Sequence, residues 1–304
     1  LTNYHANPIT SAMFITATAP NPLVVKLIAD VTGAQISLSW GTWALAMLLP
    51  GLVALAVMPL LIYLLEPPEI KSTPNAMQFA REKLRDLGPV SRGELIMLGV
   101  FAVLLVLWAG IPAFIFGPGA AVDPTTTAFI GLSLCLITGV LSWDDVIKEK
   151  SAWDTIVWFG ALVMMATFLN KLGLIGWFAK SMATGIGHLG LGWVGASALL
   201  MLTYLYAHYA FASTTAHITA MFAAFYGAGL ALGAPALPFG LMMAAASNIM
   251  MTLTHYATGT SPVVFGSGYV TLGQWWKTGF IMSVVLILIW LVVGGAWWKA
   301  LGYW

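Results

Sequence analysis

Residues 181–276 contain no Asp, Glu, Lys or Arg. Soluble domains carry about 25% charged residues, whereas this chain of 304 residues has 8% charged and 60% hydrophobic residues. Its 12 basic and 11 acidic side chains are too few to cover a globular surface of that size, so most of the exterior must face lipid. The composition therefore predicts an all-α, polytopic membrane protein.

The remaining composition excludes several classes of protein. A net charge of +1 gives no basic surface to neutralise phosphates, so no nucleic-acid partner is expected. The single cysteine, Cys135, excludes a disulfide framework and a cysteine-rich metal site. Residues 1–10 lack the basic start and apolar core of a signal peptide, and the chain begins with Leu1 rather than Met, which indicates a fragment of a longer protein.

Gaps between charged residues show where membrane spans fit. A bilayer core about 30 Å thick needs about 20 apolar residues per helix. Five candidate spans are 38–65, 95–116, 125–142, 156–169 and 278–298. The uncharged run between Lys180 and Lys277 predicts several more crossings.

The one long polar segment, residues 66–92, contains five basic side chains, Lys71, Arg81, Lys83, Arg85 and Arg92. The positive-inside rule assigns it to the cytoplasm. Alternation from this loop places 117–124 outside, where no Lys or Arg occurs, and 143–154 inside, with two lysines. Residues 76–87 place apolar side chains near one helical face, which is consistent with a short surface helix or with a solvated connector.

Two segments of the chain are similar to each other. Residues 17–25 align without gaps on residues 257–265, and both match the pattern A-T-small-x-polar-P-apolar-V. Each is a Thr-rich, Pro-containing interruption of an apolar stretch. A matched pair of interrupted segments in two halves of a chain indicates the binding site of a transporter with inverted repeats. The alternative is two unrelated loops.

A polar cluster, Ser213-Thr214-Thr215, lies in the uncharged run. The apolar stretches 194–209 and 218–232 are too close together for two full spans joined by an aqueous loop. They favour a re-entrant hairpin over about 194–232, which is tolerated in a membrane only where it lines a cavity. The equivalent hairpin of the first repeat would precede residue 1. Hydroxyls bonded back to ordinary helices are the alternative.

Hydroxyls, free backbone N–H groups and half-helix dipoles suit carboxylates, while unwound carbonyls suit Na⁺. His217 is the one histidine beside the cluster, and its protonated form would be the only nearby cation for a dianion. A neutral His217 bonded to a carbonyl remains the alternative. No role is assigned to His208 or His255, and Ser247 and Asn248 are expected to join helices.

An enzyme is not expected. An intramembrane hydrolase would use Ser213 as nucleophile with His208 or His217 as base. Ser213 lacks the G-x-S-x-G setting, no acidic residue is available to orient the imidazole, and neither H-E-x-x-H nor a pair of membrane aspartates occurs. A structural subunit would not need two matched interrupted segments.

Three stretches carry a family resemblance: 11–21, 207–213 and 253–269. Over essentially its whole length the chain resembles the divalent-anion:sodium symporter family, as the C-terminal two-thirds of a member. Within that family it is most similar to the bacterial di- and tricarboxylate antiporters, such as those that exchange L-tartrate for succinate. It is less similar to the plant 2-oxoglutarate/malate translocators.

The resemblance implies a substrate site made of a hairpin tip and two unwound loops, with the first tip having no counterpart here. By position the site residues are Ser213, Thr214 and Thr215 of the tip, Thr258, Gly259 and Pro262 of the second loop, and Thr18, Pro20 and Asn21 of the first. Thr214 stands where the sodium symporters have Asn, and His217 where the exchangers place a basic side chain. Both imply obligate exchange with no cofactor. Na⁺ is expected only under the alternative of a Na⁺-coupled di- or tricarboxylate symporter.

The resemblance also implies an elevator-type transporter that exchanges tartrate, succinate, malate or 2-oxoglutarate. It would be a multi-pass protein of the bacterial inner membrane and a homodimer. Residues 1–31 and 143–271 would form the transport domain, with a broken helix at about 239–270. Residues 32–65 and 93–142 would be scaffold, 66–92 the cytoplasmic loop, and 272–304 a last span that fits either role.

Overall fold

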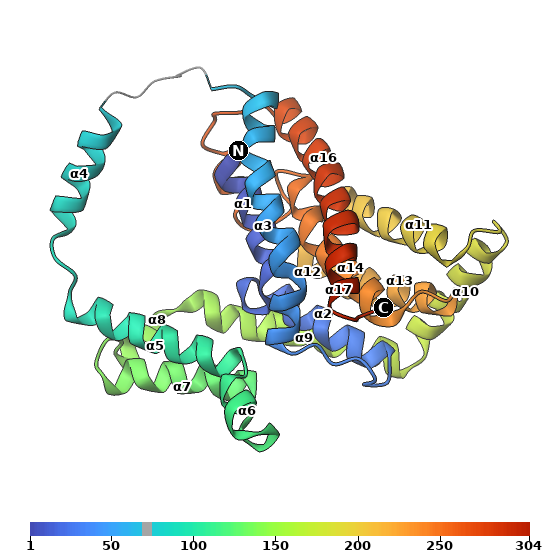
Figure 1. The fold of residues 1–304 in the computed structure, drawn as a ribbon, viewed down its shortest axis with the longest axis horizontal. Coiled ribbons are helices and arrows are strands. Elements are labelled where there is room, and N and C mark those ends of the chain that lie inside the picture. The colour runs from blue at the N-terminus through green and yellow to red at the C-terminus, as the bar shows by residue number, and fades with distance from the viewer. Residues whose placement is uncertain (69–74) are drawn as a thin grey trace. The chain divides into compact units, whose positions relative to one another are not determined.

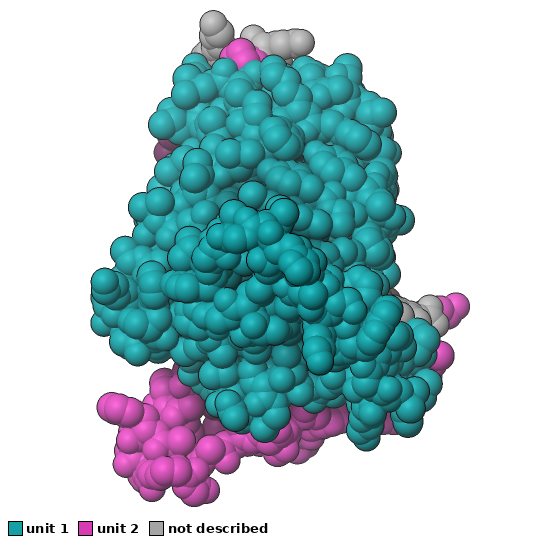
Figure 2. All heavy atoms as spheres, turned by 90° about the vertical axis from the view of Figure 1, so that its right-hand side faces the viewer, with its two compact units in different colours: residues 1–66, 158–304 teal, residues 67–157 magenta. Residues whose placement is uncertain are grey.

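The computed structural model describes residues 1–68 and 75–304, and every regular element in these residues is helical (Figure 1). The chain divides into two compact units, which Figure 2 shows in teal and magenta. Unit 1 comprises Leu1–Glu66 and Trp158–Trp304, and unit 2 comprises Pro67–Val157. The expected all-α membrane fold is confirmed.

Unit 1 contains most of the helices. They are α1 (Thr2–Met13), α2 (Pro20–Val31), α3 (Trp40–Leu65), α10 (Leu174–Gly187), α11 (Trp193–Tyr206), α12 (Thr214–His217), α13 (Ala223–Ala231), α14 (Ala236–Ile249), α15 (Ser261–Phe265), α16 (Leu272–Ile289) and α17 (Gly295–Ala300). Short turns join them: 3-10 turns η1 (Ile15–Ala17), η3 (Ala207–Ala210) and η5 (Met250–Thr252), and π-helical turns η4 (Ile218–Phe222) and η6 (Trp290–Gly294).

Unit 2 contains the helices within and after the polar segment, residues 66–92. They are α4 (Ala76–Leu87), α5 (Arg92–Trp108), α6 (Ile111–Phe116), α7 (Pro124–Ile137) and α8 (Trp143–Lys148), with a 3-10 turn η2 (Pro118–Ala120). Helix α9 (Lys150–Lys171) begins in unit 2 and ends in unit 1. Of the basic residues predicted to mark the cytoplasmic loop, Lys71 lies outside the described residues.

Two helices of the described chain are long and apolar enough to cross a membrane: α3, with 26 residues, and the continuous helix Leu272–Ala300, with 29. These confirm the predicted spans 38–65 and 278–298. The second begins earlier than predicted because Thr271 caps α16 and exchanges hydrogen bonds with Gln274. The predicted span 95–116 is instead interrupted at Gly110, which has a φ of 72°.

Buried tryptophans hold α3 to its neighbours. The Trp43 indole of α3 donates to the Ala12 carbonyl of α1 over 2.9 Å. The Trp298 indole of α17 donates to the Ala46 carbonyl of α3, also over 2.9 Å. A buried indole N–H needs such a partner, and its large ring fills the space between helices. Helices α1, α3, α14 and α16 therefore pack into one core (Figure 1).

The expected scaffold span, residues 32–65, corresponds to α3, and its role as scaffold stays a prediction. In the structure α3 packs directly on α1 and belongs to the same compact unit as α14. Residues 272–304, for which either role was open, also pack there. Hydropathy identifies a span but not its neighbours, because a helix that is apolar all round presents no distinct face.

Candidate functional site

Both similar segments coincide with interrupted helices. Helix α1 ends at Met13 and α2 begins at Pro20, with only the turn η1 between them. In the other half, α14 and η5 end at Thr252 and α15 begins at Ser261. Proline occupies the first turn of both α2 and α15, where its missing N–H costs no hydrogen bond. The first loop is defined here as residues 14–19 and the second loop as residues 253–260.

Asn21 joins the two interrupted helices. Its side-chain amide donates to the carbonyls of Ser11, over 2.7 Å, and Phe14, over 3.0 Å, which lie at the end of α1. Its Oδ1 accepts from Asn248 Nδ2 of α14, over 3.0 Å. Both side chains are buried. Every hydrogen-bonding group of the Asn21 amide is thus used within the protein, so Asn21 holds the first loop in place instead of offering a free donor to a substrate.

Two residues of α1 that sequence reasoning missed contact the other half. The Tyr4 hydroxyl donates to the Met251 carbonyl and is 2.7 Å from Ser261 Oγ. Asn7 Nδ2 donates to Thr260 Oγ1 over 3.2 Å. Tyr4, Asn7 and Ser11 recur at helical spacing, and such a polar stripe on an otherwise apolar membrane helix is the signal that could have identified them.

The hairpin tip, residues 211–215, is bonded to the second loop. The backbone N–H and the hydroxyl of Thr214 both donate to the Ala257 carbonyl, over 3.3 and 3.0 Å. Ser213 caps α12, its hydroxyl accepting from the Ala216 N–H over 3.3 Å. The Thr215 hydroxyl has no hydrogen-bond partner among the described residues, although the Thr215 side chain is largely buried. Of the three tip hydroxyls, that of Thr215 is the one that makes no hydrogen bond among the described residues, while that of Ser213 accepts one bond and donates none there.

The predicted residues of the loops occupy different positions. Thr258 lies one residue after the carbonyl that binds the tip, and its Oγ1 is 3.0 Å from Ser261 Oγ. Gly259 and Pro262 are exposed. In the other half Thr18 ends the turn η1, and the buried Pro20 starts α2. The hairpin tip therefore contacts the second loop directly, whereas the first loop is connected to α14 through Asn21.

His217 is paired with a second histidine. Its Nδ1 is 3.1 Å from His208 Nδ1, and both side chains are fully buried. The His217 ring stacks on Phe211 and tilts against Tyr204, with centroids 4.5 and 4.6 Å away. A hydrogen bond between the two Nδ1 atoms needs a proton on one of them and a lone pair on the other, so only one of the two Nδ1 atoms carries a proton. In the described chain neither Nε2 has a partner. The sequence left open a neutral His217 bonded to a carbonyl. In the structure His217 is paired with His208 instead.

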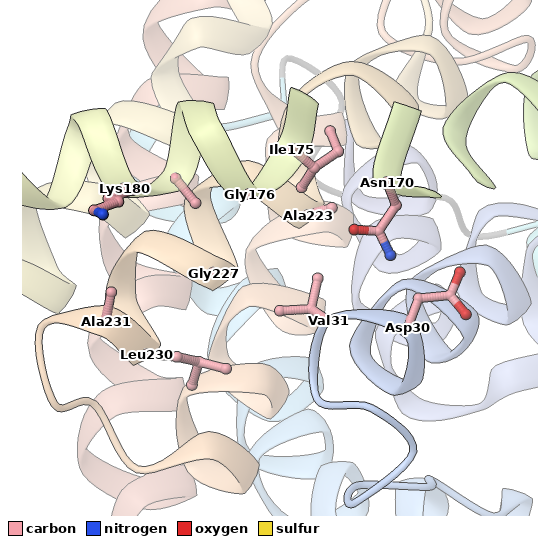
Figure 3. A pocket seen from close by; sticks show the side chains of 11 residues that line it. Asp30, Val31, Asn170, Ile175, Gly176, Lys180, Ala223, Gly227, Leu230 and Ala231 are labelled. Atoms are coloured by element: carbon pink, nitrogen blue, oxygen red, sulfur yellow. The ribbon is translucent and has the colours of Figure 1, made fainter. Parts of the chain in front are cut away.

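A cavity of about 510 Å³ lies elsewhere in unit 1, between α2, α10 and α13. Asp30 and Asn170 lie at one end and Lys180 at the other, with small apolar side chains between them (Figure 3). Its lining includes none of the predicted site residues. This cavity is therefore not the predicted site.

The whole chain, residues 1–304, matches the family model described as the sodium:sulfate symporter transmembrane region. YflS of Bacillus subtilis (strain 168), whose name proposes malate as its substrate, is 50% identical over 303 residues, 100% of this chain and 61% of YflS. Dicarboxylate transporter 1, chloroplastic, of Spinacia oleracea is 47% identical over 304 residues, 100% of this chain and 52% of that protein. Inner membrane protein YbhI of Escherichia coli (strain K12) is 35% identical over 301 residues, 99% of this chain and 61% of YbhI. The chain thus spans between half and two thirds of these curated relatives.

The contact between Asn21 and Asn248 can be tested by a double-mutant cycle. Asn21→Ala leaves the Ser11 carbonyl and one N–H of the Asn248 amide without this partner in the core, while the Phe14 carbonyl keeps its bond from the Ala17 N–H. We therefore expect the free energy of unfolding to fall by about 1–3 kcal/mol. Asn248→Ala removes the same inter-helix bond, so the two losses should not add. Unfolding in detergent measures both, with the exposed Asn3→Ala as the neutral control. Simple additivity would show that the two amides do not couple the repeats.

Proposed function

The chain belongs to the family of the sodium:sulfate symporter transmembrane region, and we propose that its parent protein carries small dicarboxylates across a membrane. One observation carries the proposal. In a stretch without any fixed charge, the hairpin tip is bonded to an unwound loop through Thr214 and Ala257. Irregular backbone at membrane depth persists only where it is enclosed by protein or lines a cavity. An enzymatic role has no support in the family or the relatives.

The proposed substrate site uses hydroxyls and open backbone. Thr215 and Thr258 supply hydroxyls, and the exposed Gly259 lets a ligand approach the main chain. Ser213 and Thr214 hold the tip, Asn21 holds the first loop, and Thr18, Pro20 and Pro262 shape the ends of the loops. Neutral donors of this kind suit carboxylates. The proposed substrates are C4 or C5 dicarboxylates, namely tartrate, succinate, malate or 2-oxoglutarate. The names of the spinach and Bacillus relatives support dicarboxylates in general and malate in particular.

The proposed mode of transport is exchange without Na⁺. The Thr214 hydroxyl and the Ala257 carbonyl bond to each other, which leaves the carbonyl less available to a cation. The pair of His208 and His217 gives the tip a proton-binding group in place of a metal ion. Na⁺-coupled symport is the second candidate, and the description of the family model favours it.

The proposed setting is the inner membrane of a bacterium, where a homodimer would work by an elevator movement. Two bacterial relatives support this, one of them named as an inner membrane protein. Because α3 and α16 pack on the interrupted helices, the proposed moving part includes α3, which was expected to be scaffold, and α16, for which either role was open.

The mode of transport predicts how uptake depends on the contents of a vesicle. In proteoliposomes of the complete protein, uptake of labelled succinate should require an unlabelled dicarboxylate inside. An imposed Na⁺ gradient across empty vesicles should give no uptake above that of protein-free vesicles. Na⁺-driven uptake into empty vesicles would instead establish the symporter.

The free hydroxyl of Thr215 predicts a loss of affinity on its removal. Thr215→Val keeps the size of the side chain but deletes a charge-assisted bond worth about 1.5–3 kcal/mol, so the apparent affinity should fall roughly 10- to 150-fold. Thr215→Ser, which retains the hydroxyl, should remain close to wild type. Equal affinity of Thr215→Val and wild type, at normal expression, would remove Thr215 from the site.

The histidine pair predicts a pH dependence. A proton on the pair adds positive charge beside the dianion, so the apparent affinity for tartrate should rise as the pH is lowered from 8 to 6.5. Tartrate itself, whose carboxyl groups titrate below about pH 5, stays doubly ionised over this range. His217→Gln should bind roughly tenfold or more weakly at the lower pH and lose the dependence. The exposed His188→Gln is the matched control, and an unchanged profile in His217→Gln would exclude the pair as the cation.

A further inference from the structure

Helix α4 (Ala76–Leu87) exposes a row of large apolar side chains. Every residue of α4 is exposed. Met77, Leu84 and Leu87, which share one face of the helix, have between 67% and 82% of their surface accessible, and Phe79, which lies outside that face, has 61%. An exposed apolar row of this size marks an interaction surface for a protein or a membrane.

The charged residues of α4 are sorted around this apolar row. At about 100° per residue, Met77, Ala80, Leu84 and Leu87 fall within an arc of about 80°. Arg81 and Lys83 flank the arc, each about 40° outside one edge. Glu82 and Asp86 lie on the opposite side of the helix. Basic side chains at the edges, with acidic ones facing away, are typical of a helix lying in the interface of an anionic membrane, where long basic side chains reach the headgroups.

The orientation of α4 agrees with this pattern. Its axis is bent by 99° from that of α5, which follows after the turn at Gly88. Helix α5 is apolar and begins at Arg92 with a capping box formed by Ser91 and Glu94. Helix α4 therefore does not continue α5 as one straight span, and with the apolar α5 placed in the membrane, the bend directs α4 along the membrane surface. The five charged residues of α4 exclude it from the hydrocarbon core as half of a broken span.

We propose that α4 lies in the headgroup region of the cytoplasmic leaflet and binds anionic phospholipids. Met77, Leu84 and Leu87 enter the boundary of the acyl chains. Arg81, Lys83 and Arg85 contact lipid phosphates, while Glu82 and Asp86 face water. This occupant is favoured over another protein because charge complementarity and orientation both point to the plane of the bilayer. The helix thereby anchors the connection between α3 and α5 at the membrane surface.

A pair of probes on the two faces of α4 tests the proposal. Cys135 is the only cysteine and is buried, so Cys135→Ala gives a background for labelling; if that variant does not fold, the native Cys135 stays in place and the unsubstituted chain supplies the blank. Leu84→Cys and Glu82→Cys are each labelled with an environment-sensitive fluorophore in the full chain. The vesicles contain phosphatidylcholine with or without phosphatidylglycerol, and each composition is also prepared with spin-labelled quencher lipids.

The two probes should respond differently. With phosphatidylglycerol, the probe at position 84 should shift to shorter wavelength and be quenched by the lipid label, while the probe at position 82 stays in water. Without it, the effect at position 84 should weaken. Arg81→Gln, Lys83→Gln and Arg85→Gln should each lower the ratio of bound to free helix about fivefold, whereas Glu82→Gln with Asp86→Asn should not lower it.

Three outcomes would overturn the proposal. The probe at position 84 could remain in water with anionic lipid present. The basic substitutions could leave the quenching unchanged. The probe could become buried in detergent as the protein concentration rises, which would identify a protein as the occupant. These experiments measure the binding of α4 to lipid, so none of their outcomes bears on the proposed transport of dicarboxylates.

Discussion

The hydrocarbon core of a membrane offers no water, so each backbone group freed by an interrupted helix needs a partner within the protein. The two interruptions of this chain free such groups at equivalent places. A side chain of the same half completes the first interruption, and a side chain of the opposite half completes the second. Asn21 binds two carbonyls at the end of α1 and also Asn248. Tyr4 binds the carbonyl of Met251. The rest of the site depends on these bonds, because the loops hold their shape only while they are satisfied.

This requirement separates two kinds of polar residue that look alike in sequence. Asn21 and Thr214 are fully engaged within the protein, and their removal would open a loop or detach the tip. Thr215 has a hydroxyl without such a bond in the described residues, and Gly259 is exposed. Position in a motif groups all four together, whereas hydrogen bonding divides them into residues that hold the geometry and residues proposed to contact substrate.

Local chemistry explains which parts of the fold were predictable. Proline alone does not stop a helix here, because Pro8 lies inside α1 and Pro50 and Pro59 lie inside α3. The Thr-rich, Pro-containing pattern shared by residues 17–25 and 257–265 indicated both interruptions correctly, and a proline stands in the first turn after each break. The bond between Tyr4 and Ser261 joins residues far apart in the chain, and the pairing of His208 with His217 depends on how a short turn folds. Such contacts are set by tertiary packing, which composition and spacing do not specify. The packing of α3 on α1 was missed for the same reason.

A paired histidine is well suited to a proposed exchanger because its charge can be removed. A fixed lysine beside the tip would be an uncompensated charge in a low-dielectric region whenever the substrate left, at a cost of several kcal/mol. The neutral pair of His208 and His217 keeps the bond between its two Nδ1 atoms and still has one Nε2 able to accept a proton. Protonation converts that Nε2 into a donor without breaking the existing bond. Positive charge would then be present when a dianion is bound and absent when the site is empty, which links occupation of the site to its electrostatics without a metal ion.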